Sequence, residues 1–169
     1  RNKVSTLVTL THRPSGIAAH AGERRSQMEN RAVALRRLRL ALAVHVRTQA
    51  PPPPAPRGKT RESFLAALDA TISTAGRPGE QNSALWRSRV GATRHGSTGR
   101  IACNPDHHDY PALLAEALDT VADSAWEPKP AAERLGITPS QLVKLVKDHP
   151  PAMVEWNAER AKRGSHPLK

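Results

Sequence analysis

Residues 4–21 read V-S-T-L-V-T-L-T-H-R-P-S-G-I-A-A-H-A, and this stretch decides the fold of the first part of the chain. Over Val4–Thr11, apolar and polar residues alternate and β-branched residues are frequent, which is typical of a strand. Arg13–Gly16 indicates a turn, because Pro14 restricts φ and Gly16 tolerates a positive φ. Ile17–Ala21 can return as the partner strand. The stretch therefore predicts a β-hairpin.

A long helix is expected after the hairpin. Ser26 and Glu29 have the spacing of a capping box, with Ser26 as the N-cap, and no Gly or Pro follows before Pro51. At about 100° per residue, apolar residues gather on one face and arginines on another. The apolar face, which we expect to cover the hairpin, consists of Met28, Leu35, Leu38, Leu42 and Val46. The other face, which we expect to stay solvated, carries Arg36, Arg39 and Arg47.

The middle of the chain reads as a linker and a basic region. The run P-P-P-P-A-P within 50–58 is typical of a polyproline spacer. Glu62–Ala75 predicts a short helix that ends at Gly76. Its inward face would consist of Phe64, Leu65, Leu68 and Ile72. Arg77–Gly99 is rich in Gly, Arg and Ser without periodicity, so we expect a mobile basic loop there.

The last part of the chain is expected to be helical. Pro111–Ala125 predicts a helix with Pro111 at its first position, and its apolar stripe is Leu113, Leu114, Ala117, Leu118 and Val121. Residues 130–148 have the pattern of a helix-turn-helix, in which Gly136 ends the first helix and Thr138 caps the second. Pro150-Pro151 would end that second helix, and Ala152–Arg163 can form a last one.

Together these patterns predict an α+β protein: a small hairpin-plus-helix domain, a proline-rich linker and an all-α region with a helix-turn-helix. The expected domains are 1–47, a linker at 48–61, a short helix with a basic loop at 62–100, and a helical domain at 101–169.

Charge is distributed unevenly along the chain. Lys and Arg total 26 against 15 Asp and Glu, for a formal net charge of +11. Residues 1–47 carry +8 and 48–100 carry +5, whereas 101–128 carry −6 and 129–169 carry +4. A basic first half of this kind favours binding to nucleic acid phosphates.

Composition excludes several classes of protein. No stretch approaches the roughly 20 apolar residues of a membrane span, and a single cysteine, Cys103, rules out an internal disulfide framework. Aromatic residues make up 3% of the chain, which disfavours base stacking on sheet aromatics. Nothing indicates a cofactor, and we expect a cytoplasmic protein.

Three blocks in the first part of the chain resemble class I peptide chain release factors and bacterial ribosome-rescue hydrolases, in their peptidyl-tRNA hydrolysis domain. Asn2-Lys3-Val4 resembles the segment after the family's Gly-Gly-Gln loop. Thr11–Ile17 resembles its strand-turn-strand signature. The helix-opening motif is matched by Glu23–Gln27 followed by Asn30-Arg31 and Ala34-Leu35, and the spacing of the blocks agrees with the family.

The resemblance implies a domain that enters the peptidyl transferase centre and hydrolyses the ester between peptide and tRNA. The Gly-Gly-Gln tripeptide, which positions the attacking water in the family, does not occur in these 169 residues. It would lie immediately upstream of Arg1, so we expect truncation there rather than loss of the motif. No catalytic residue is therefore assigned. Codon-independent rescue is favoured over termination, because nothing downstream resembles a stop-codon-reading domain.

Arginine and lysine residues of this part are candidates for contacts with rRNA or tRNA phosphates, since the arginine fork donates two hydrogen bonds at once. The candidates are Arg1, Lys3, Arg13, Arg24, Arg25, Arg31, Arg36 and Arg39. The alternatives are a non-enzymatic ribosome- or RNA-binding relative and a DNA-binding regulator. The second helix of the helix-turn-helix would then expose Gln141, Lys144 and Lys147 to a groove. We favour a packing or ribosome-contact role for that motif over DNA binding.

A cluster of potential metal ligands precedes the helix at Pro111. It consists of Cys103, Asp106, His107, His108 and Asp109. Its spacing matches no strong zinc pattern, and Asn104-Pro105-Asp106 reads equally as a turn, so we expect no metal there. A nucleophilic pair of Cys103 with one of these histidines is also not expected, because the sequence suggests no third group to orient the histidine.

Overall fold

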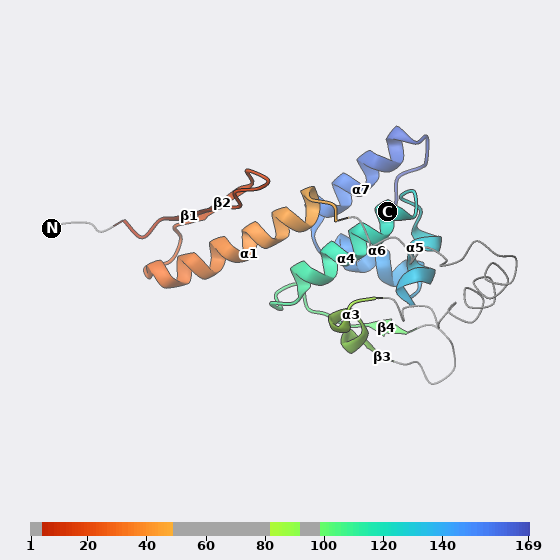
Figure 1. Cartoon of the computed structure of the whole chain (residues 1–169), viewed down its shortest axis with the longest axis horizontal. Helices are drawn as coiled ribbons and strands as arrows, with labels where there is room; N and C mark the ends of the chain where they lie inside the picture. The colour runs from red at the N-terminus through yellow and green to blue at the C-terminus, as the bar shows by residue number, and fades with distance from the viewer. Residues whose placement is uncertain (1–4, 49–81, 92–98) are drawn as a thin grey trace, which may run out of the picture.

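The computed structural model describes residues 5–48, 82–91 and 99–169, in which six helices accompany two short antiparallel ladders (Figure 1). The fold class is α+β, as the sequence predicts. The elements in chain order are β1 (Val8–Thr11), β2 (Ala18–Ala21), α1 (Gln27–His45), α3 (Ala84–Arg89), β3 (Val90–Gly91), β4 (Arg100–Ile101), α4 (Tyr110–Asp123), α5 (Pro128–Leu135), α6 (Pro139–Lys147) and α7 (Pro150–Lys162).

The β1–β2 hairpin forms where the sequence predicts it, with shorter strands. Val8 pairs with Ala21 and Thr11 with Ala18 in antiparallel register. Gly16 adopts a φ of +72°, and its N–H donates to the carbonyl of His12 at 2.8 Å. The hairpin lies along the first half of α1 (Figure 1).

Helix α1 buries two different faces along its length. Its first half packs against the hairpin through Ala34 and Leu38, and its last turns join the helical core through Ala43 and Val44. At about 100° per residue the centres of these two faces are offset by about 150°. The single apolar face predicted for this helix is therefore partly wrong: Met28 is 81% exposed.

The arginine face of α1 also differs from the expectation of a solvated surface. Arg47 is half-buried and Arg36 faces the C-terminal region, and each forms an ion pair with an aspartate there. The reason is that the arginine face of α1 lies toward α4 and the segment before it in the second half of the helix.

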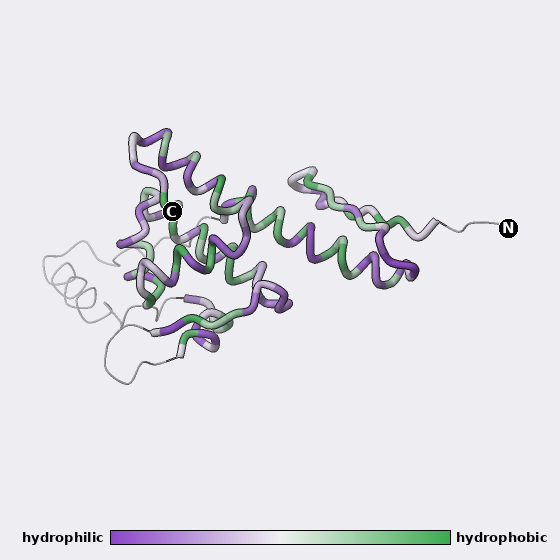
Figure 2. Tube along the Cα trace, turned by 180° about the vertical axis from the view of Figure 1, so that it is seen from behind, coloured by the Kyte–Doolittle hydropathy of each residue, from purple (hydrophilic) through white to green (hydrophobic). Residues whose placement is uncertain are grey.

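The main core lies among the C-terminal helices. Every residue of the stripe predicted for α4 has zero exposure. Three tryptophans join this core: Trp86 Nε1 donates to Leu135 O at 2.9 Å, and Trp156 Nε1 donates to Trp126 O at 3.0 Å. Green, hydrophobic segments alternate with purple, hydrophilic ones along these helices (Figure 2).

The predicted helix-turn-helix is formed by α5 and α6. Gly136 ends α5 with a φ of +69°, and the Thr138 side chain accepts a hydrogen bond from Gln141 N at the start of α6. Pro150 and Pro151 follow the end of α6 and occupy the first turn of α7, where the missing N–H has no intrahelical partner to lose.

The loop expected over 77–99 is wrong for residues 84–91, which form α3 and β3. Ser83 caps α3, and the burial of Trp86 against α5 anchors this short helix. A helix of six residues with a single buried aromatic side chain shows no apolar periodicity in its sequence, so the sequence pattern did not predict it. The proline-rich run, the helix expected at 62–75 and the rest of the basic loop lie outside the described residues. Among the described helices, none is both long and apolar enough to cross a membrane.

Candidate functional site

The predicted RNA-binding residues of the described part are exposed and fall into two groups. Arg24, Arg25 and Arg31 surround the start of α1, whereas Arg13 lies in the hairpin turn and Arg39 further along α1. None of these five side chains makes an ion pair with a residue that the structure describes. Arg1 and Lys3 lie outside the described residues.

Asn30 connects the loop before α1, which carries Arg24 and Arg25, to the segment that leads into the hairpin. Its side chain has zero exposure. Its Oδ1 accepts from Arg24 N at 2.8 Å, and its Nδ2 donates to Thr6 O at 2.7 Å and to Arg24 O at 2.9 Å. The backbone of Arg24 is thus held on both sides, and Thr6 lies directly beside it.

Arg37 ties the same loop to β2. Its Nη1 donates to His20 O at 2.8 Å, and its Nη2 lies 2.5 Å from Glu23 Oε1. Hydrogen bonds from the backbone N–H of Glu23 itself and from Arg37 lower the pKa of the Glu23 carboxyl. Glu23 is therefore ionised near neutral pH and forms an ion pair with Arg37.

Sequence reasoning missed Asn30 and Arg37 as organising residues. Asparagine is unfavourable inside a helix, because its side chain competes for backbone groups. An asparagine four residues after the N-cap, inside the first turns of a helix, was the sequence signal for a side chain that bonds to the backbone nearby. Ser26 occupies the N-cap position that the sequence predicts, but its side chain makes no capping hydrogen bond.

An exposed stripe of mixed character runs along α1. Met28, Arg31, Leu35 and Arg39 recur at helical spacing on one side, and Met28 and Leu35 are 81% and 39% exposed. We call these four residues the α1 stripe. Cations beside exposed apolar groups suit a surface that contacts both phosphate and the faces of bases or ribose.

Arg36 differs from the other candidates. Its Nη2 donates to Asp106 Oδ1 at 2.7 Å and to Pro105 O at 2.8 Å. Both side chains remain largely exposed, at 44% and 81%. The pair joins the basic helix to the acidic segment before α4, so Arg36 is already partnered by a carboxylate.

A groove of about 590 Å³ runs between α1 and α4. Its apolar lining includes Leu42 and Val46 from α1 and Pro111 and Ala112 from α4. His12 and Arg39 also line it, so the groove borders the second group of candidate arginines.

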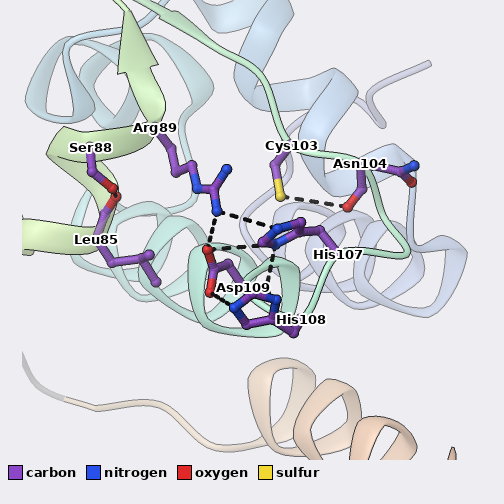
Figure 3. A network of polar contacts seen from close by, with 8 residues as sticks. All are labelled: Leu85, Ser88, Arg89, Cys103, Asn104, His107, His108 and Asp109. Atoms are coloured by element: carbon purple, nitrogen blue, oxygen red, sulfur yellow. Dashed lines mark hydrogen bonds and ion pairs between the residues drawn. The ribbon is translucent and has the colours of Figure 1, made fainter.

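The histidine cluster before α4 is organised around Asp109 (Figure 3). Arg89 Nη2 lies 2.5 Å from Asp109 Oδ2 and 3.4 Å from His107 Nε2. His108 Nε2 lies 3.0 Å from Asp109 Oδ1. The hydrogen bond from Arg89, with smaller contributions from the two histidines, lowers the pKa of the Asp109 carboxyl.

The ligand atoms of His107, His108 and Asp109 lie within 4.8 Å of one another, which satisfies the spacing of a metal site. However, the guanidinium of Arg89 already contacts two of these groups, and Asp109 N donates to His107 Nδ1 at 3.2 Å. A metal ion would have to displace a resident cation. The contacts instead join α3 to the start of α4.

Cys103 lies close to this cluster but is not arranged as a nucleophile. Partial burial raises the pKa of its thiol, and the thiol donates to Asn104 O at 3.5 Å. The thiol is therefore mainly protonated at neutral pH, when a nucleophilic cysteine needs the thiolate.

Comparison with known proteins leaves the family of this chain open. No family model matches the sequence, and no solved structure matches the fold.

Proposed function

We propose that this chain is a release-factor-like protein that binds the ribosome through its hairpin and α1. The observation that carries the proposal is that Asn30 holds the helix-opening motif together and ties it to the segment that leads into the hairpin. Glu23–Gln27 is bonded to Asn30 through Arg24, and Thr6, which leads into the hairpin, is bonded to both Asn30 and Arg24.

The geometry supports a rigid basic surface. The loop that carries Arg24 and Arg25 is bonded to Asn30 and, through Glu23, to Arg37. Phosphate contacts made by pre-positioned arginines lose less conformational entropy on binding than those of a free loop. The α1 stripe adds Arg31 and Arg39 to the same unit.

The reaction of such a protein would be hydrolysis of the peptidyl-tRNA ester, in codon-independent rescue rather than in termination. Within the 169 residues no Gly-Gly-Gln tripeptide is present to position the water. The hairpin and α1 would anchor a Gly-Gly-Gln loop that precedes Arg1, because the chain enters the hairpin beside Arg24 and Asn30. These 169 residues alone are therefore expected to bind ribosomes without releasing peptide.

Ribosome co-sedimentation tests the binding. The Arg24→Ala/Arg25→Ala/Arg39→Ala variant should bind more weakly and with a shallower dependence on salt, because each lost phosphate contact removes about 0.9 from the slope of log K against log salt. Lys162→Ala/Lys169→Ala removes charge from the C-terminal end and should bind normally. Binding that is insensitive to salt would contradict the proposal.

Peptide release tests the reaction. A Gly-Gly-Gln loop placed before Arg1 should allow release of labelled formyl-methionine from stalled ribosomes, whereas the unextended chain should remain at background. If a folded, extended chain binds ribosomes but releases nothing, the non-enzymatic relative is favoured.

A further inference from the structure

Helix α6 buries one face and leaves another open. Leu142, Leu145 and Val146 are at most 4% exposed and belong to the core. Ser140, Lys144 and Lys147 are exposed, and at about 100° per residue they fall within about 60° of one another. We call these three residues the α6 stripe. Packing of the helix-turn-helix against the core therefore involves one face of α6 and leaves the α6 stripe exposed.

The β3–β4 ladder is attached to the turn that precedes α6. Gly99 N donates to Gly136 O at 2.7 Å, and Ile101 N donates to Gln141 Oε1 at 3.2 Å. A Cβ on Gly99 would lie 2.1 Å from Val90 Cγ1, so this close approach requires glycine. Arg100, between the two attachment points, is exposed beside the start of α6.

The charges of this surface favour an anionic partner. Lys144, Lys147 and Arg100 form no ion pair with any residue in the described ranges. The sequence of α6 itself contains no carboxylate, and Asp148 follows directly after its end. Three exposed cations on a helix and an adjoining strand can neutralise the phosphates of a duplex.

We propose that the α6 stripe binds double-stranded DNA, with α6 in the major groove and Arg100 on the phosphate backbone. The B-form major groove is about 12 Å wide and admits an α-helix, whereas the major groove of an RNA duplex is too deep and narrow. In this geometry α5 crosses the backbone, as the first helix of a helix-turn-helix does.

The same contacts predict weak sequence preference. Gln141, which the sequence places among the groove-facing residues, is half-buried and its Oε1 is bonded to the backbone of Ile101. Ser140 remains to face base edges, whereas Lys144 and Lys147 can reach phosphates. Phosphate contacts therefore dominate the affinity, and this activity goes beyond ribosome binding because it uses a surface remote from the hairpin.

Fluorescence anisotropy with the full chain tests the proposal, using a labelled DNA duplex and an RNA duplex of the same sequence. The DNA duplex should bind more tightly. Lys144→Ala/Lys147→Ala should weaken DNA binding about tenfold or more and reduce the slope of log K against log salt by about 2. Lys162→Ala/Lys169→Ala, which removes the same charge elsewhere, should bind like the wild type.

Two further variants separate DNA binding from misfolding and from the ribosome. Asp148→Asn removes the carboxylate beside the α6 stripe and should tighten DNA binding, which a misfolded chain would not do. Arg24→Ala/Arg25→Ala should weaken ribosome binding and leave DNA binding unchanged. Equal affinity for both duplexes, or an equal loss in the Lys162/Lys169 control, would overturn the proposal.

Discussion

Asn30 replaces three hydrogen bonds to water with three to backbone groups in an almost water-free position. Truncating such a residue leaves buried donors and acceptors without partners, which costs more than the net value of the bonds themselves. Asn30 therefore controls whether the loop that carries Arg24 stays attached to Thr6 and the segment that leads into β1.

Asn30→Ala should destabilise the hairpin by about 2–3 kcal/mol. Hydrogen exchange of the β1 amides should speed up accordingly. The three tryptophans all lie in the C-terminal core, so the melting curve followed by their fluorescence should change little. Gln27→Ala, at an exposed neighbouring position, is the matched control. Equal losses in exchange protection and in the fluorescence melt would show that Asn30 stabilises the whole chain instead.

Asp109 introduces a pH dependence. Arg89 lowers the pKa of this carboxyl below its ordinary value of 3.8. A carboxyl with a lowered folded pKa contributes stability above its unfolded pKa, and the contribution is lost as the pH falls through the folded value.

Asp109→Asn should therefore be less stable than the wild type at neutral pH, and this difference should shrink as the pH falls below 3.8. Urea unfolding followed by tryptophan fluorescence at a series of pH values measures this. Asp106→Asn, at an exposed carboxyl, provides the comparison. A difference that stays constant over the acid range would show that Arg89 and Asp109 are not coupled by charge.

At the scale of elements, α1 connects the hairpin to the core through its last turns. Arg47 Nη1 lies 3.1 Å from Asp119 Oδ1, and Thr48 N donates to the same oxygen at 3.3 Å. Arg47 also donates to the carbonyls of Ala43 and Val44, which the end of the helix leaves without intrahelical partners.

A double-mutant cycle should separate this pair from Arg36–Asp106. The Arg47 and Asp119 side chains are 26% and 17% exposed, so Arg47→Ala and Asp119→Ala should couple by about 1 kcal/mol. The more exposed Arg36–Asp106 pair should couple by less than about 0.5 kcal/mol. Equal coupling in both cycles would mean that burial does not set the strength of these contacts.

At the scale of the whole molecule, apolar burial is unequal. The C-terminal core combines three tryptophans with long aliphatic side chains, whereas the hairpin buries mainly Ala19 and Ala21 against Ala34 and Leu38. Small side chains remove little apolar surface from water, so each contributes little to stability. The hairpin is the weaker part of a connected structure.

Amides of β1 and β2 should therefore exchange through local opening at a lower free energy than amides of α4. Leu118→Ala, at a fully buried site, should lower the stability of the core by about 2–5 kcal/mol and shift the tryptophan melt. Local exchange of the hairpin should not change in that variant. Exchange of both parts at one common free energy would indicate a single cooperative unit.

The sequence alone was sufficient for the elements whose signals are local. Pro14 and Gly16 specify the hairpin turn, and Gly136 with Thr138 specifies the turn between α5 and α6. The apolar stripe of α4 was predicted residue by residue, because that helix is buried along one continuous face. Local backbone preferences and a single periodicity can be read without knowing the partner.

Only the tertiary structure decided which face of α1 is buried, because this helix packs on the hairpin and then on α4, and two offset faces cancel a single periodicity. It also placed Arg36 and Arg47 against aspartates about 70 residues away, formed α3 around Trp86, and attached Gln141 to β4. These contacts join distant segments, and their energies depend on burial and geometry that arise only when the segments meet.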